Sequence, residues 1–260
     1  MARHGSVAMS PADRPPTTAV VTGASRGFGA AVAAALIGRG HRVVGVARTA
    51  DALAEVRREL GSEFVPVVAD AADAEIAGAL IERYRPTVLV LNAGATPGIG
   101  PVHEQTWESF SRNWQVDTRH VFHWIGAALR YPLAPGSLVV AISSGAAVGG
   151  SPLSGGYSGA KAMIRFLAGY AAEESRRAGL GIGFVTVLPQ LTPATELGAA
   201  GVAAYAGRRG IDTATFTAAF EPLLTPAIVG SEIARLCQDT GDPDEHRVFR
   251  IDGHGLHAPA

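Results

Sequence analysis

Short apolar runs rich in valine alternate with longer segments of helical periodicity along most of this chain. The apolar runs predict buried strands over residues 18–22, 42–47, 64–69, 87–91, 137–143, 183–188 and 247–251. The periodic segments predict helices over residues 28–39, 51–60, 73–84, 104–130, 157–178 and 227–239. Such alternation is typical of βαβ units on a parallel sheet that is buried on both faces. We therefore expect an α/β protein with a doubly wound parallel sheet of about seven strands and helices on both faces, in three αβα layers.

Two segments interrupt this alternation. Residues 1–17 are polar, contain several prolines and lack the apolar core of a signal peptide, so we interpret them as a flexible N-terminal tail. Residues 18–260 are predicted to form a single domain, because nothing in them is typical of a linker between two cores. Residues from about 190 to 225 carry no predicted strand, and connections of this length are usually lids or binding loops. We expect this segment to be a substrate lid.

Charge and composition exclude several classes of function. Lys and Arg number 22 against 23 Asp and Glu, so no net field attracts nucleic acid or an anionic membrane. No apolar run reaches the 18 or so residues of a membrane span. The single cysteine, Cys237, cannot form an internal disulfide, which suits a reducing cytoplasm. His120 and His123 have no further ligands at metal-binding spacing, so we predict no metal site and expect both on a helix face that packs or meets a partner.

A glycine-rich turn follows the first predicted strand. The segment TGASRGFG, residues 22–29, stands between a strand and a helix, where backbone N–H groups can approach a pyrophosphate. The second strand ends with Ala47 and Arg48 in place of the carboxylate that a free ribose 2′-hydroxyl prefers. Arg48, together with Arg26 in the turn, could bind a 2′-phosphate. These residues predict NADP(H) in preference to NAD(H); if Arg48 is only a solvated loop residue, NAD(H) is possible.

A tyrosine and a lysine stand four residues apart in the segment GGYSGAKAMIRF. On an α-helix Tyr157 and Lys161 lie on the same face, about one turn apart. A cation beside a phenol lowers the phenol's pKa from its usual value of about 10, which makes it a usable proton donor and acceptor. The same spacing also occurs by chance on solvated helices. The surrounding motifs must therefore decide whether Tyr157 and Lys161 are a catalytic pair or two surface residues.

Those motifs point to one family. With TGASRGFG, LNAGA (residues 91–95) and YSGAK (residues 157–161) in this order, the chain resembles the short-chain dehydrogenase/reductase family, in its compact single-domain branch with a Rossmann-like fold. The resemblance runs from about Thr18 to the C-terminus. It implies that Tyr157 is the acid/base, that Lys161 binds the nicotinamide ribose and lowers the tyrosine pKa, and that Ser144 holds the substrate carbonyl oxygen.

The resemblance also implies a set of cofactor contacts around the glycine-rich turn and Arg48. Asp70 and Ala71 are expected beside the adenine, and Thr192 beside the nicotinamide carboxamide. The full expected set is Gly23, Ser25, Arg26, Gly27, Phe28, Gly29, Arg48, Asp70, Ala71, Asn92, Ala93, Gly94, Tyr157, Lys161, Pro189 and Thr192.

Three residues depart from the family pattern. One of them, His254 in DGHG, stands where a second glycine is common, and we interpret it as a loop or subunit-contact residue. Aligning NWQVDTRHVF with the pattern VN…G.F puts Asp117 where the family commonly has an asparagine that completes the catalytic set through a water near the lysine. Aspartate is nearly the same size, but its charge would alter the proton balance of the lysine. Gln190 stands where a glycine usually follows the proline, and its side chain is expected to narrow the pocket.

The sequence therefore predicts an NADP(H)-dependent carbonyl reductase or secondary alcohol dehydrogenase, with a small-molecule carbonyl or alcohol as substrate. The apolar side chains of the lid favour a hydrophobic ketone. One alternative is a non-catalytic NADP-binding sensor or structural protein, which only Asp117 and Gln190 favour. Another is a nucleotide-sugar epimerase or dehydratase, which usually needs a larger C-terminal domain. The family resemblance further implies a homotetramer, or a homodimer through the two long helices.

Overall fold

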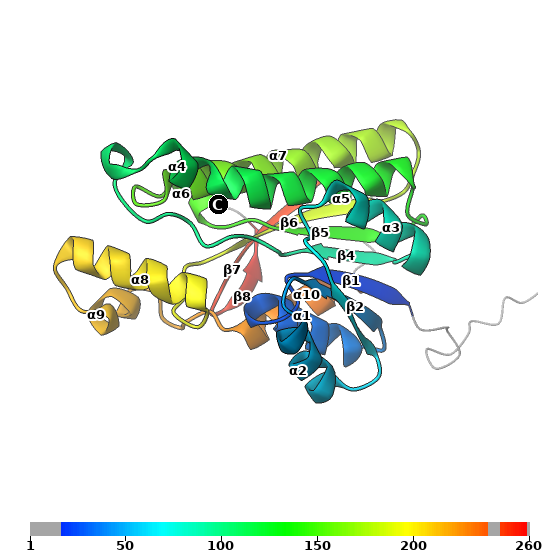
Figure 1. Cartoon of the computed structure of the whole chain (residues 1–260), viewed down its shortest axis with the longest axis horizontal. Coiled ribbons are helices and arrows are strands. Elements are labelled where there is room, and N and C mark those ends of the chain that lie inside the picture. Colours follow the sequence, from blue (N-terminus) through cyan, green and yellow to red (C-terminus); the bar gives the residue numbers. More distant parts are fainter. Residues whose placement is uncertain (1–16, 239–244, 259–260) are drawn as a thin grey trace, which may run out of the picture.

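An eight-stranded sheet forms the centre of the molecule, for which the computed structural model describes residues 17–238 and 245–258 (Figure 1). Its strand order is β3-β2-β1-β4-β5-β6-β7-β8, and all neighbouring pairs are parallel except β7 with β8. The strands are β1 (Thr18–Thr22), β2 (Arg42–Ala47), β3 (Phe64–Val68), β4 (Val88–Leu91), β5 (Leu138–Ile142), β6 (Gly183–Pro189), β7 (Arg247–Asp252) and β8 (Gly255–His257). The winding reverses between β1 and β4, and such a switch point opens a crevice at the carboxyl ends of the strands.

Helices cover both faces of the sheet (Figure 1). One face carries α1 (Gly27–Ile37), α2 (Ala50–Leu60) and α10 (Pro226–Leu236). The other carries α3 (Ala74–Tyr84), α5 (Arg119–Arg130) and α7 (Gly155–Arg177). The doubly wound, three-layer architecture predicted from the alternation of apolar runs is thereby confirmed. Apart from Thr17, the predicted N-terminal tail lies outside the described residues.

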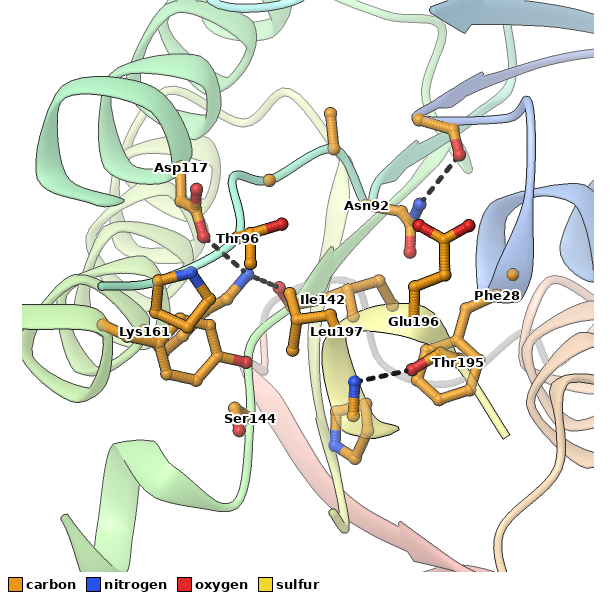
Figure 2. Close-up of a pocket in the computed structure, with 18 of the residues that line it drawn as sticks. Phe28, Asn92, Thr96, Asp117, Ile142, Ser144, Lys161, Thr195, Glu196 and Leu197 are labelled. Carbon is orange, nitrogen blue, oxygen red and sulfur yellow. Dashed lines mark hydrogen bonds and ion pairs between the residues drawn. The ribbon is translucent and has the colours of Figure 1, made fainter. Parts of the chain in front are cut away.

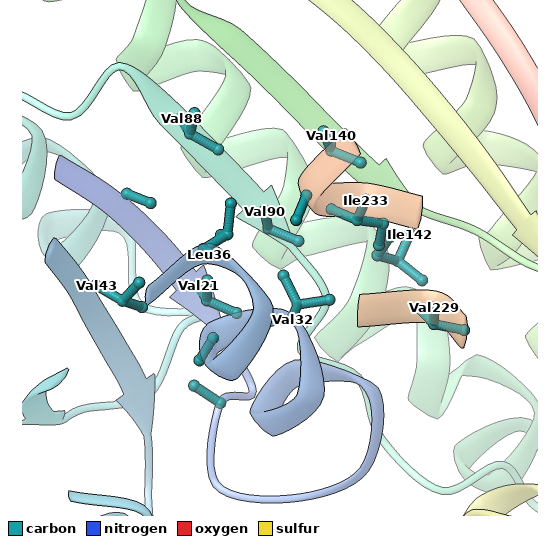
Figure 3. Close-up of a cluster of buried hydrophobic side chains, with 14 of the residues drawn as sticks. Val21, Val32, Leu36, Val43, Val88, Val90, Val140, Ile142, Val229 and Ile233 are labelled. Atoms are coloured by element: carbon teal, nitrogen blue, oxygen red, sulfur yellow. The ribbon is translucent and has the colours of Figure 1, made fainter. Parts of the chain in front are cut away.

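Two apolar cores, one on each face, fix the register of the strands. In β4, Val88 and Val90 point into the core beneath α1 and α10 (Figure 3). The alternate residues Leu89 and Leu91 point into the opposite core, which contains Trp124. Burying one side chain of this size contributes about 1.5–3 kcal/mol, so both faces of the strand resist a shift by one residue. The carboxyl end of β4, where the site begins, is held in place by this packing.

An eighth strand and a divided helix differ from the sequence prediction. The three-residue strand β8 returns antiparallel beside β7, pairing Ile251 with Leu256, and is too short to produce a recognisable apolar run. The predicted helix over 104–130 consists of a 3-10 turn (Val102–Glu104), α4 (Trp107–Asn113), a π-helical turn η3 (Trp114–Thr118) and α5. A capping box between Thr106 and Ser109 begins α4. The helical periodicity of the sequence continues through residues 104–130, so it does not indicate where the helix is interrupted.

The segment from 190 to 225 contains no strand and two helices, α8 (Glu196–Arg209) and α9 (Thr213–Ala218), which extend beyond one end of the sheet (Figure 1). The side chains of Thr195 and Asp212 cap these helices by accepting from the backbone N–H groups of Gly198 and Thr215. Val202, Ala206 and Phe216 form a small apolar core of the segment's own. We refer to residues 190–225 as the lid.

Candidate active site

A cavity of about 920 Å³ opens at the carboxyl ends of β1, β2, β4, β5 and β6, with the lid along one wall. Within the described ranges, 17–238 and 245–258, no group of three or more His, Cys, Asp or Glu could hold a metal ion, and no helix is long and apolar enough to cross a membrane. The predicted site residues that line this cavity are Gly23, Ser25, Arg26, Gly27, Phe28, Arg48, Asp70, Ala71, Asn92, Ala93, Gly94, Asp117, Ser144, Tyr157, Lys161, Pro189 and Thr192.

Gly29 is the exception among the predicted residues, because it does not line the cavity. It is buried, and a Cβ added to it would lie 2.2 Å from the carbonyl oxygen of Gly23. The absence of a side chain at Gly29 therefore lets α1 pack directly on the turn that precedes it. Its geometry gives this residue a packing role, and the expected cofactor contact stays a prediction.

The glycine-rich turn forms a cradle that is tied to the end of β4. Gly27 has a φ of +55°, which favours glycine, and a Cβ added to it would meet only the Thr195 side chain of the lid, 3.7 Å away. The Asn92 amide donates to the carbonyl of Thr22 at 3.0 Å, and the Thr22 hydroxyl accepts from the backbone N–H of Asn92 at 2.9 Å. A bare backbone at the start of α1 suits the close approach of a pyrophosphate. The residues present fit a dinucleotide cofactor.

Two arginines lie at the end of this cradle beside β2. Arg48 follows β2 and is exposed, and its side chain makes no ion pair or hydrogen bond within the part of the chain that the structure describes. Arg26, at the start of α1, forms an ion pair with Glu196 of the lid. Asp70, after β3, uses one carboxylate oxygen to accept the Ala72 N–H at 2.9 Å. Of the two arginines, Arg48 therefore has no charged partner among the described residues, while Arg26 is paired with a carboxylate.

The structure separates the roles of two adjacent serines after β5. Ser143 is buried, and its hydroxyl donates to the main-chain carbonyl of Lys161 at 2.7 Å. Ser144 is half-buried on the cavity wall, and among the described residues its hydroxyl oxygen accepts only the Ala146 N–H, at 3.2 Å. The Tyr157 hydroxyl makes no hydrogen bond to any described residue. Ser144 and Tyr157 thus present hydroxyl groups to the same cavity, while Ser143 fastens β5 to α7.

Lys161 is buried beside Tyr157 on α7. Its Nζ lies 3.3 Å from Oδ2 of Asp117, 3.3 Å from the carbonyl oxygen of Ile142 and 5.6 Å from the centre of the Tyr157 ring (Figure 2). Burial alone would lower the pKa of Lys161, but the charges of Asp117 and Tyr157 and the hydrogen bond to Asp117 outweigh it and leave that pKa raised. The ammonium group is therefore held in its charged form.

Asp117 is fully buried on the π-helical turn and is surrounded by donors. Its Oδ1 accepts the Ala95 N–H at 2.8 Å, and the Asn113 amide lies 3.4 Å from both carboxylate oxygens. A Cβ on Gly94 would come within 2.9 Å of the carboxylate, so glycine is needed where the loop after β4 passes it. A π-helical turn often marks a functional position, and here it brings Asp117 to Lys161.

His120 is a cavity residue that the sequence analysis missed. It is fully buried on α5, packs edge-on against Trp124, and neither ring nitrogen has a hydrogen-bond partner among the described residues. Burial, assisted by the charge of Lys161, lowers the pKa of His120 to about 3, so its ring is neutral. The signal was present, because His120 occupies the position of the glycine in the pattern VN…G.F.

The lid contributes side chains in ways that spacing did not reveal. The Thr192 side chain is buried and its hydroxyl donates to the carbonyl of Leu224, so this hydrogen bond joins the two ends of the lid. Tyr205 of α8 reaches across to the loop after β5, where its hydroxyl bonds to Ser151 and accepts the Leu153 N–H at 3.3 Å. This end of the cavity is mostly apolar, with Ile99, Leu153, Leu191, Leu197 and Tyr205 in its wall.

Comparison with known proteins gives consistent results. A family model described as short chain dehydrogenase matches residues 17–204. Cis-4-hydroxycyclohexanecarboxylate dehydrogenase of Sinomonas cyclohexanicum is 32% identical over 246 residues, which are 90% of this chain and 94% of that protein. A probable NADP-dependent dehydrogenase in the aabA 3′ region of Dichelobacter nodosus is 41% identical over 97 residues, which are 34% of this chain and 92% of that protein.

The solved structures show the same fold. A crystal structure of a 3-oxoacyl-[acyl-carrier protein] reductase from Brucella melitensis, in complex with NAD, matches with a TM-score of 0.76 and 24% identity. The match covers 93% of this chain and 97% of that one. At this identity the likeness bears on the architecture alone, and it agrees with the three layers described above.

Proposed function

Because the chain belongs to the short-chain dehydrogenase/reductase family, and is thus an oxidoreductase acting on CH–OH or C=O groups with a nicotinamide cofactor, we propose that it is an NADP(H)-dependent carbonyl reductase or secondary alcohol dehydrogenase. The family predicted from the sequence motifs is thereby confirmed. The observation that carries the proposal is the meeting of Ser144, Tyr157 and Lys161 at one cavity, with the ammonium of Lys161 held charged beneath the tyrosine ring.

In the direction of reduction, two hydroxyl groups act on the substrate carbonyl. Ser144 donates a hydrogen bond to the carbonyl oxygen and so polarises the carbonyl group. Tyr157 donates the proton that this oxygen takes up. The bound nicotinamide supplies the hydride at its C4 atom. In the direction of oxidation Tyr157 accepts the proton from the alcohol.

Lys161 and Asp117 act on the reaction indirectly, without donating a proton to the substrate. The ammonium of Lys161 provides a fixed positive charge 5.6 Å from the centre of the Tyr157 ring. We propose that it also binds the nicotinamide ribose, as the family resemblance implies. Asp117 reaches the reaction only through Lys161, which it holds in position and keeps protonated. We therefore propose a positioning role for Asp117, at the place where the family pattern has an asparagine that completes the catalytic set through a water near the lysine.

Arg48 supports NADP(H) as the preferred cofactor. Its guanidinium has no partner in the described residues and lines the cavity at the end of β2, where a 2′-phosphate would be recognised by a cation. The backbone of the glycine-rich turn would hold the pyrophosphate, and the loop Asn92–Gly94 would line the nicotinamide half. The names of similar proteins mention both cofactors: one relative is named a probable NADP-dependent dehydrogenase, and the Brucella reductase structure is a complex with NAD.

A hydrophobic ketone or the corresponding alcohol is the substrate class that we propose. The apolar wall formed by Ile99, Leu153, Leu191 and Leu197 supports it, because desolvation of an apolar substrate favours binding there. Gln190 lines the same cavity and adds a polar side chain. The non-catalytic alternative rests on Asp117 and Gln190 alone, whereas Ser144, Tyr157 and Lys161 all line the cavity and support an enzyme.

We also propose a cytoplasmic homo-oligomer. The one cysteine supports the location, since a protein of a reducing compartment needs no disulfide. Exposed aromatic side chains on the outer sides of α5 and α7, namely Phe122, Phe166 and Tyr170, support self-association through these two helices.

A panel of carbonyl compounds tests this proposal. Ketones that range from small and polar to cyclic and apolar are incubated with the protein and either NADPH or NADH, and the loss of absorbance of the reduced cofactor is followed. The expected result is oxidation of NADPH, faster than that of NADH, with an apolar ketone. Failure to oxidise either cofactor with any ketone, together with no reduction of either oxidised cofactor by the matching alcohols, would contradict it.

A further inference from the structure

An ion pair joins the lid to the cofactor turn across the cavity. Glu196, the first residue of α8, accepts a hydrogen bond from the guanidinium of Arg26, which directly precedes α1. The neighbouring Thr195 comes within 3.7 Å of where a Cβ on Gly27 would lie. Figure 2 shows Thr195, Glu196 and Phe28 on the same side of the cavity, away from Lys161 and Asp117. Two segments that are far apart in the sequence therefore meet at this point.

Glu196 supplies a negative charge that the turn itself lacks. The first turn of α1 contains no acidic residue, and no side chain caps its N-terminus. Arg26 and the start of α1 together form a positively charged region, which the carboxylate of Glu196 partly neutralises. Arg26, Arg48 and Glu196 all line the same cavity, so they lie in the region that the proposed dinucleotide would occupy.

The ion pair between Arg26 and Glu196 can exchange one partner for another. The two side chains are 69% and 74% exposed, and an ion pair so open to water contributes little to the stability of the fold. A phosphate ester carries nearly two negative charges and three acceptor oxygens, so it competes effectively with a carboxylate for a guanidinium. Arg26 can therefore leave Glu196 for a phosphate without disturbing the core.

We propose that Glu196 is an internal counter-ion of Arg26 that the 2′-phosphate of NADP(H) displaces, so that Glu196 lowers the affinity for NADP(H) and moderates the preference over NAD(H). This inference rests on the proposed function, in which Arg26 and Arg48 bind that phosphate. NAD(H) has a hydroxyl at the same position and leaves the ion pair intact. Binding of NADP(H), but not of NAD(H), therefore releases the first turn of α8 from the glycine-rich turn.

Direct titration of the cofactors tests the proposal without any turnover. Dissociation constants for NADPH and NADH are measured by fluorescence on the parent protein, Glu196→Gln, Arg26→Gln and the double variant. Glu196→Gln is expected to bind NADPH threefold to fivefold more tightly, which corresponds to about 0.7 to 1 kcal/mol, and NADH within 1.5-fold of the parent. In the Arg26→Gln background the same substitution is expected to change the NADPH affinity by less than 1.5-fold.

Controls separate this inference from the proposed function. Glu82→Gln removes the same charge from the exposed side of α3 and is expected to leave both affinities unchanged. If Arg26→Gln weakens the binding of NADPH but Glu196→Gln leaves it unchanged, the role of Glu196 is overturned and the proposed function is not. An equal gain for NADPH and NADH, or an equal gain with and without Arg26, would also overturn it. If Arg26→Gln does not weaken the binding of NADPH, then Arg26 does not bind the 2′-phosphate, and both that assignment and this inference fail.

Discussion

At the scale of single residues, the decisive feature is a pair of opposite charges kept from water. The side chains of Lys161 and Asp117 are 7% and 1% exposed. Removing two ions from water costs several kcal/mol each, and the pair persists because the charges meet and because Ala95 and Asn113 donate to the carboxylate. Asp117 thus determines both the position and the protonation of Lys161, on which Tyr157 depends.

Replacing Asp117 tests this dependence through stability. Asp117→Ala leaves a buried ammonium without its counter-ion and is expected to lower the free energy of unfolding by about 3–5 kcal/mol. Asp117→Asn is expected to cost less, because the amide oxygen still accepts the Ala95 N–H. Urea denaturation at pH 7 measures both values. A loss below about 1 kcal/mol in the alanine variant would show that the pair is not the structural unit described.

The pH dependence of stability provides a second check of the pair. The folded protein raises the pKa of Lys161, so the resulting stabilisation is complete below the unfolded value of about 10.4 and is lost as the pH rises through the folded value. In Asp117→Asn, burial without the counter-ion lowers that pKa, so the difference in unfolding free energy between the parent and this variant is expected to be largest at low pH and to narrow as the pH rises, including above about pH 10.5. A difference that widens at high pH would contradict the raised pKa.

Several of these residue-level facts could be anticipated, and others could not. The spacing of motifs identified Asp117 as the residue near Lys161 and indicated that its charge matters. The direct contact depends on the π-helical turn Trp114–Thr118, which leaves no trace in a helical periodicity. The inward-turned hydroxyl of Thr192 and the cavity position of His120 depend on side-chain direction, which spacing alone does not determine.

At the scale of elements, the start of α7 is placed by a close backbone contact. A Cβ on Gly156 would lie 1.8 Å from the carbonyl oxygen of Phe110 in α4, so only glycine allows the two helices to approach here. Tyr157 is the next residue, and its position therefore depends on this contact. Gly159, in the same helix, has no neighbour within 4 Å of an added Cβ.

These two glycines form a matched pair of substitutions. Gly156→Ala forces α4 and α7 apart and is expected to lower the free energy of unfolding by about 2 kcal/mol or more, and to reduce turnover by displacing Tyr157. Gly159→Ala is expected to be neutral or to stabilise by up to about 1 kcal/mol, because alanine is the better helix former. Denaturation curves of both variants measure this, and equal stabilities would refute the close contact.

The predictability of the elements follows from how they are buried. The ends of the parallel strands agree with the sequence to within about one residue, because strands such as β1 and β2 are continuous apolar runs between two helical layers. The strand β8 was missed because three residues cannot show a pattern. The capping box that begins α4 was overlooked because it lies inside a longer periodic segment.

At the scale of the whole molecule, the lid and the outer helices present two different surfaces. The lid lies at the carboxyl ends of the strands and contacts both the glycine-rich turn and the loop after β5, through Glu196 and Tyr205. The helices α5 and α7 lie together on the opposite side of the sheet from α1 (Figure 1). Their outer side exposes the stacked rings of Phe166 and Tyr170. Self-association through this surface stays a prediction.

Light scattering tests the predicted assembly. Replacing Phe166 and Tyr170 together by glutamate places charge on the proposed contact and is expected to halve the molecular mass in solution, because a charge buried without a partner opposes association. Val68→Glu, which changes an exposed apolar residue at the sheet edge, is expected to keep the parent mass. A parent protein that is already monomeric, or a double variant of unchanged mass, would contradict the proposal.

The central claim is that Tyr157 donates the proton to the substrate oxygen, and one comparison tests it most directly. The rate of NADPH oxidation with the best ketone of the panel is measured at saturating cofactor for the parent and for Tyr157→Phe, after titration has established that both bind NADPH equally. The account predicts a fall of at least a hundredfold in kcat, since the variant loses the proton donor and keeps the ring. A variant that turns over the ketone as fast as the parent would contradict the mechanism.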